Sequence, residues 1–236
     1  MSLILSIDTA TAQGSVSLAK EGKLLAAKTN DQQKDHAAWI HVAIRELMEQ
    51  AGYNLHNLNA VAVVAGPGSY TGLRVGMATA KGICYACQAP LITLNTLYIM
   101  AFAAHRQILL QAAAGTIGEN ILFCPMIDAR RMEVFTALYD NELKEIVSPS
   151  ALVLEPGVFD NWQDKRHIIF FGNGSHKCKS LGVHKGEVWG DFFYYPEHVT
   201  LLAQERFGRG QFTDMAYAEP AYLKDFYTHH KNPTVK

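Results

Sequence analysis

The chain has 236 residues, and 49% of them are hydrophobic, so it is long enough for one large or two small domains with a buried core. Its 21 basic and 22 acidic residues balance, which argues against a protein that grips nucleic acid on its own through a broad basic face. The sequence has no apolar run of membrane-spanning length, no secretory signal pattern and only four cysteines. We therefore expect a cytoplasmic protein that does not span a membrane.

The first 30 residues predict a three-stranded antiparallel meander. Strands expected at residues 3–7, 15–19 and 24–29 are separated by polar turns. Asp8 lies at the first corner, directly after a buried strand, and Thr9 follows it. A carboxylate and a hydroxyl in this position could orient a hydrated metal ion and a phosphate. The alternative is that the two side chains only cap the turn.

A helix with one apolar face is predicted over residues 35–51. Its apolar residues recur at intervals of three and four, and Gly52 supplies a stop signal. His36 and His41 are five residues apart, so they do not form the pair of histidines, four apart, that a zinc protease helix carries. We expect them to be surface or interface histidines rather than metal ligands.

A glycine-rich turn at residues 66–76 joins a predicted buried strand at 60–65 to a predicted helix at 73–86. Backbone N–H groups at such a strand-to-helix turn can face an anion, which makes Gly66 and Gly68 candidates for holding a phosphate. The glycine spacing matches neither the P-loop nor the dinucleotide-binding motif. A tight turn without any ligand therefore remains an equal alternative.

The second half of the chain repeats the layout of the first. A predicted strand at 91–94 and a helix ending near 111 lead into a small, polar segment at 112–120. We place a domain boundary there, which gives an N-terminal unit at residues 1–111 and a smaller C-terminal unit at 112–236. The second unit also opens with a predicted strand, an acidic turn at Asp128 and two further strands.

The remainder of the second unit is predicted to be poorer in structure. A buried strand at 167–171 ends in Gly172 and Gly174, which again suits a phosphate but lacks the P-loop lysine. A helix at 196–207, a short ordered segment at 220–224 and a frayed tail at 228–233 follow.

Four motifs together resemble the TsaB (YeaZ) family. They are IDTAT at residues 7–11, AGPGSYTGLRVG at 65–76, DARRMEVF at 128–135 and PAYLK at 220–224. The resemblance covers essentially the whole chain. It implies an α/β fold of the actin-like ATPase (ASKHA, ribonuclease H-like) type, duplicated into two lobes of which the second is reduced.

The resemblance also implies a role in forming threonylcarbamoyladenosine next to the anticodon of tRNAs. In that family TsaB supports its paralogue TsaD, the transferase, and the ATPase TsaE joins them. TsaB forms a homodimer when alone, and tRNA is reached only through the complex. The resemblance implies no catalytic residue and no firmly held cofactor in this chain, although ATP or ADP could occupy a shared site in the complex. That vestigial or shared site would use Asp8, Thr9 and the two glycine turns.

The catalytic paralogue holds a metal with two histidines four residues apart on the helix that corresponds to residues 96–111. Here that helix has only His105, with alanine and leucine at the two partner positions, so we expect no metal site. The alternatives that stay open are an independent ATPase, using Asp8 and the glycine turns, and a metal-dependent glycoprotease-like peptidase.

The two predicted helices of the first unit are the candidates for a partner interface. In the family the corresponding helices form a helical bundle between subunits. The candidate contact residues are His36, Ile40, Ile44, Arg74, Met77 and Lys81. The alternative is that these residues face the chain's own sheet, because periodicity cannot separate the two cases for a helix that is apolar on more than one side.

Overall fold

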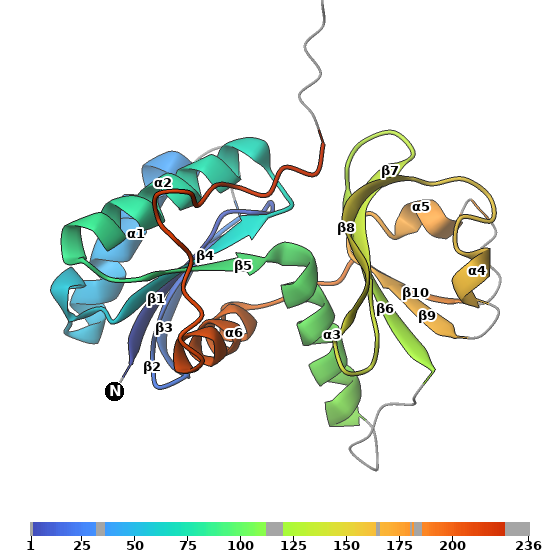
Figure 1. Ribbon diagram of the computed structural model, residues 1–236. Coiled ribbons are helices and arrows are strands. Elements are labelled where there is room, and N and C mark those ends of the chain that lie inside the picture. The colour runs from blue at the N-terminus through green and yellow to red at the C-terminus, as the bar shows by residue number, and fades with distance from the viewer. Residues whose placement is uncertain are drawn as a thin grey trace, which may run out of the picture.

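The computed structural model describes residues 2–31, 36–111, 120–163, 166–179, 181 and 186–224. These residues form two lobes, each built on a five-stranded sheet (Figure 1). Nearly all of the connector predicted at 112–120, and the tail predicted at 228–233, lie outside the described residues. Within the described part of the chain, no helix is long and apolar enough to cross a membrane.

The sheet of the first lobe has the strand order β3-β2-β1-β4-β5. The predicted opening meander is confirmed, because β1 pairs antiparallel with β2 and β2 pairs antiparallel with β3. The strands β4 and β5 then extend the sheet on the other side of β1 in parallel. The strands are β1 (Leu3–Asp8), β2 (Gly14–Lys20), β3 (Lys23–Asn30), β4 (Ala60–Gly66) and β5 (Leu91–Asn95).

Both faces of this sheet are apolar, and each is covered by helices. On one face, Leu5 and Ile7 of β1 pack with the helices α1 (His36–Ala51) and α2 (Tyr70–Cys87). A single 3-10 turn, η2 (Leu55–Asn57), leads from α1 towards β4. The opposite face carries Ile4, and it packs under α6 (Pro196–Gly208).

The sheet of the second lobe has the order β10-β9-β6-β7-β8, which matches the first lobe strand for strand. The predicted duplication is therefore confirmed. Its strands are β6 (Ile121–Asp128), β7 (Glu133–Tyr139), β8 (Glu145–Val153), β9 (His167–Phe171) and β10 (Gly186–Gly190). The second lobe is the reduced one, because its own helices α4 (Asp160–Gln163) and α5 (His176–Lys179) are one turn each.

The helix α3 (Thr96–Gln111) follows β5 and covers the second sheet (Figure 1). Its buried residues Leu97, Met100 and Ala104 pack against Phe123 of β6. The chain thus crosses from one lobe to the other through this helix, before the predicted boundary near residue 111.

The last part of the described chain returns to the first lobe. Besides α6, a strap at residues 209–224 runs back along α2 (Figure 1). The N–H of Thr213 donates to Leu91 O at 2.8 Å, and the N–H of Ala221 donates to Ala65 O at 2.8 Å. The simple division at 111/112 does not describe this packing, because the first sheet has a second apolar face that α6 must cover. The ordered segment expected at 220–224 is the end of the strap.

Candidate functional site

Asp8 ends β1 in a buried position, at 4% exposure. Its Oδ1 accepts a hydrogen bond of 2.9 Å from the N–H of Ala10. Burial raises the pKa of this carboxyl, while the Ala10 amide, the Tyr194 hydroxyl and His36 act in the opposite direction. A carboxylate covered in this way is poorly placed to hold a hydrated metal ion.

Thr9 and the glycine-rich turn are bound to each other. The hydroxyl of Thr9 donates to Gly72 O at 2.7 Å, and the N–H of Ser69 donates to Ala10 O at 2.7 Å. The side chain of Ser69 in turn caps α2 by accepting from the N–H of Gly72 at 3.3 Å. Two donors at the start of α2, the N–H groups of Ser69 and Gly72, are therefore used by the chain itself.

The glycines of this turn are required by close backbone contact. A Cβ on Gly68 would lie 2.1 Å from Ala10 O, and one on Gly72 would lie 2.1 Å from Thr9 O. Gly66 has φ +113° and would place a Cβ 3.1 Å from Ala221 O of the strap. Each glycine makes room for another part of this chain, so packing alone accounts for the glycines.

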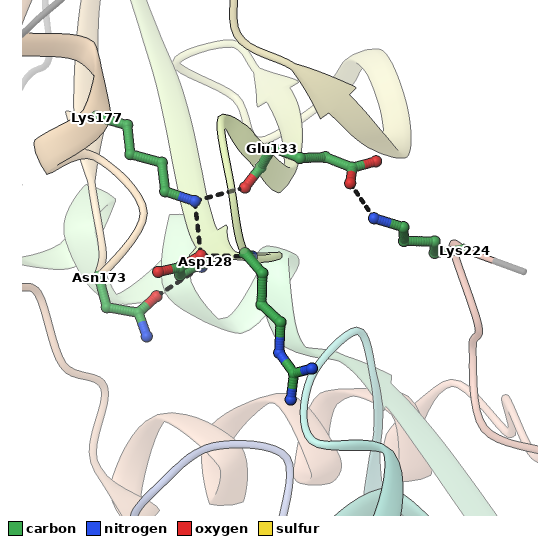
Figure 2. A network of polar contacts seen from close by, with 6 residues as sticks. Asp128, Glu133, Asn173, Lys177 and Lys224 are labelled. Atoms are coloured by element: carbon green, nitrogen blue, oxygen red, sulfur yellow. Dashed lines mark hydrogen bonds and ion pairs between the residues drawn. The ribbon is translucent and has the colours of Figure 1, made fainter. Parts of the chain in front are cut away.

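The second lobe has a corresponding site, but its aspartate has a different partner (Figure 2). Asp128 ends β6 as Asp8 ends β1, but it is half-exposed and its Oδ1 accepts from Lys177 Nζ at 2.6 Å. The Lys177 ammonium also donates to Glu133 O at 2.8 Å, and Lys224 of the strap pairs with the Glu133 carboxylate. Lys177 holds the pKa of Asp128 below its usual value.

The glycine turn after β9 packs as the turn after β4 does. Gly172 has φ +97° and would place a Cβ 2.4 Å from Met126 O, and Gly174 would place one 3.1 Å from the N of Asp128. The side chain of Asn173 accepts from the N–H of Asp128 at 2.9 Å (Figure 2). The structure thus brings each predicted glycine pair to its predicted aspartate, but as a packed turn in both lobes.

The structure places four of the six predicted interface residues in the core of the first lobe. His36, Ile40, Ile44 and Met77 are between 0 and 4% exposed. The apolar residues at intervals of three and four form the side of each helix that faces the sheet. Their apolar surface is buried within the chain itself. They cannot contact a partner in this conformation.

Arg74 and Lys81 do reach the surface, and both bind the strap. The Arg74 guanidinium lies 4.0 Å from the ring centre of Tyr70, and its Nε donates to the Tyr222 hydroxyl at 2.8 Å. The ammonium of Lys81 donates to Ala218 O at 3.0 Å. These contacts fix the strap along one side of α2.

The surface that remains on the two helices was missed by the periodicity argument. We call it the outer helical face, and define it by its exposed residues on α1 and α2. It contains two exposed large side chains, Val42 at 44% and Tyr85 at 78%. Its small and apolar members are Ala38, Val42, Ala78, Gly82 and Tyr85, and His41, Arg45, Glu46 and Glu49 of α1 are exposed beside them. The signal in the sequence was the small residues at intervals of three and four, half a turn away from the buried face.

Metal chemistry finds no support in the described ranges. His105 Nε2 donates to Asn141 O at 3.0 Å, and the His105 ring lies 5.8 Å from that of Phe123. Burial lowers the pKa of His105. No three His, Cys, Asp or Glu side chains within the described residues are grouped to hold a metal ion.

Comparison with known proteins decides the family. The family model of TsaD, tRNA N6-adenosine threonylcarbamoyltransferase, matches residues 23–155. The chain belongs to this family. Among its relatives are TsaB proteins that match over nearly full length: the Escherichia coli protein, named for tRNA threonylcarbamoyladenosine biosynthesis, is 29% identical over 94% of both chains.

Solved structures agree with this assignment. YeaZ from Pseudomonas aeruginosa is 27% identical, with a TM-score of 0.78 over 94% of this chain and all of that one. The Lmo2764 protein from Listeria monocytogenes is 10% identical, with a TM-score of 0.51 over 89% and 99% of the two chains, and it shows the shared fold alone. The expected actin-like fold and the TsaB resemblance are confirmed.

Proposed function

We propose that this chain is a support subunit in the formation of threonylcarbamoyladenosine in tRNA, and that it binds and activates a TsaD-type transferase. The observation that carries the proposal is the contrast between its two candidate sites. The glycine turns and aspartates make contacts within the chain, whereas the outer helical face exposes small and apolar side chains. A chain that offers a surface rather than a chemical site is suited to support another enzyme.

The outer helical face has the composition that helix packing requires. Ala38, Ala78 and Gly82 are small, so a partner helix can approach the backbone closely. Val42 and Tyr85 provide larger apolar area, and a tyrosine is a common energetic anchor of an interface. Large exposed apolar side chains next to small residues on a helix are a common feature of interaction sites.

The partner that this face fits best is a chain of the same fold. The TsaD family model covers more than half of the present chain, so a TsaD protein carries the corresponding strand-helix units. Two such chains can pack their helix pairs about an approximate two-fold axis, as identical subunits do in a dimer. The same face would form a homodimer when the transferase is absent.

TsaE and tRNA contact this subunit only after it has paired with the TsaD-type transferase. In the proposal, the ATPase TsaE joins the assembled TsaB–TsaD-type pair in the cytoplasm, and tRNA binds only to the complex. The balanced net charge of the chain supports this, because independent tRNA binding needs many cationic contacts.

Co-purification with the TsaD paralogue of the same organism tests the proposal. Val42→Glu and Ala78→Arg each place a charge on the outer helical face, and we expect both to abolish pairing. Val153→Glu is the matched control, because Val153 is a comparably exposed valine, at 55%, on the edge strand of the second lobe. It should pair as the wild type does.

Circular dichroism and sedimentation of the isolated variants complete the experiment. We expect native spectra, and a shift from dimer to monomer for the two variants of the outer helical face. If both variants still pair with the transferase, the interface lies elsewhere and this assignment fails.

A further inference from the structure

Tyr194 lies at the junction of the two lobes, in the segment between β10 and α6. Its ring packs against two cores at once. One is the first-lobe core that contains Ile4 and Ala10, and the other is the core between α3 and the second sheet, which contains Phe171. A side chain shared in this way gains its full apolar burial only while the lobes stay together.

The hydroxyl of Tyr194 is buried and interacts with the Asp8 carboxylate, although the pair does not reach full hydrogen-bond geometry. Burial and the charge of Asp8 raise its pKa well above the usual value. Ser6, on the same side of β1, and Thr96, at the start of α3, are further buried hydroxyls without a described partner. Polar groups are thus incompletely satisfied at Tyr194 and in the elements next to it, which is unfavourable in a closed interior.

We propose that Tyr194 is a latch between the lobes. Its ring holds the lobes together, whereas hydration of Asp8 and of the neighbouring hydroxyls would separate them. Burial of the ring favours the closed arrangement. Solvation of the Asp8 carboxylate and of the Tyr194 hydroxyl favours an open one, in which water supplies the missing partners. Because the two contributions oppose each other at one contact, this side chain sets how often the junction opens.

The latch is independent of the proposed partner surface. Asp8 and Ser6 lie on the side of the first sheet that α6 covers, whereas the outer helical face belongs to α1 and α2 on the other side. If the pairing experiment fails, the latch proposal still stands. If the latch experiment fails, the proposed partner surface still stands.

Hydrogen exchange of the full chain tests the latch. The probe is the amide of Ala10, which donates to Asp8 directly at the junction. Tyr194→Ala removes the ring, and we expect this amide to exchange at least tenfold faster, with no change at the β4 amides of the first-lobe core. Tyr195→Ala is the matched control, because Tyr195 is the next residue and is 59% exposed; it should exchange as the wild type does.

Tyr194→Phe keeps the ring, so the Ala10 amide should exchange much more slowly than in Tyr194→Ala. The proposal is overturned if the Ala10 amide of a folded Tyr194→Ala chain exchanges at the wild-type rate. It is also overturned if the β4 amides are accelerated as much as the Ala10 amide. If Tyr194→Ala does not fold, Tyr194→Leu, which keeps a smaller apolar side chain, replaces it: faster exchange of the Ala10 amide than in Tyr194→Phe supports the latch, and equal exchange overturns it.

Discussion

The glycines at the two strand-to-helix turns are explained by what their missing side chains would touch. Gly68 lies against Ala10 O, and Gly174 lies against the backbone at Asp128. Both contacts join the turn to the loop that follows the first strand of its lobe. At the scale of single residues, the glycine pattern therefore marks a close approach of two backbone segments.

Gly68→Ala should destabilise the chain by at least about 2 kcal/mol, because the new Cβ meets a backbone oxygen that cannot move aside. Gly208→Ala is the control, since a Cβ there meets nothing within 4 Å. It should leave the stability unchanged or raise it by up to about 1 kcal/mol. Urea unfolding followed by circular dichroism measures both. Equal stabilities for the two variants would contradict this account of the turn.

Asp8→Asn should stabilise the chain at neutral pH, because asparagine keeps the oxygen that accepts from Ala10 and removes a buried charge. The pKa of Asp8 is raised in the folded chain, so its favourable contribution is present below the unfolded value of 3.8 and is lost as the pH rises through the folded value. The stability advantage of the variant should therefore grow with pH.

Urea unfolding of wild type and Asp8→Asn at several pH values between 4 and 8 checks this, as groups common to both chains cancel in the difference. Asp128 and Glu46, whose pKa values are lowered, are among these common groups. An advantage that shrinks as the pH rises would show that Asp8 is stabilised as the anion in the folded chain.

At the scale of elements, the strap at 209–224 completes the first lobe. It pairs with the edge strand β5 at Leu91, accepts from Lys81 and covers Gly66. Its Met215 and Ala218 belong to the same core as α1 and α2. An edge strand that would otherwise be open is thereby protected from pairing with other chains.

A chain that ends at residue 210 should unfold at a lower urea concentration and be about 2 to 4 kcal/mol less stable, taking about 1 kcal/mol for each lost hydrogen bond. A chain that ends at Lys224 is the control, because it keeps every contact described for the strap. Equal midpoints for the two truncations would show that the strap adds nothing to the first lobe.

At the scale of the whole molecule, duplication has produced two related sites with different electrostatics. Asp8 is buried beside Tyr194, and Asp128 is neutralised by Lys177. In both lobes the glycine turn is packed against the loop that carries the aspartate. The two aspartates thus differ in burial and in charge partner, although they occupy corresponding positions.

Isothermal titration of the isolated chain with Mg²⁺ and ATP should therefore give no saturable binding, and no phosphate should be released over time. The purified ATPase TsaE, measured with the same solutions, is the positive control. Saturable binding with turnover would favour the independent ATPase instead, and would assign the turns at Gly66 and Gly172 a role beyond packing.

The sequence by itself determined the alternation of strands and helices, the duplication, the glycine turns beside Asp8 and Asp128, and the family. These are local patterns or short motifs, and backbone preferences and hydrophobic periodicity act over the same short range. That is why the meander, α1, α2 and β9 were predicted correctly at their positions.

Only the tertiary structure decided which side of each helix is buried, where α6 and the strap pack, and what surrounds Asp8. Ile40 and Met77 looked suited to a partner, but the sheet of the first lobe covers them. Tyr194 is 186 residues beyond Asp8 in the chain, so no local pattern could bring them together. Periodicity identifies a face of an element, whereas its burial depends on which distant element covers that face.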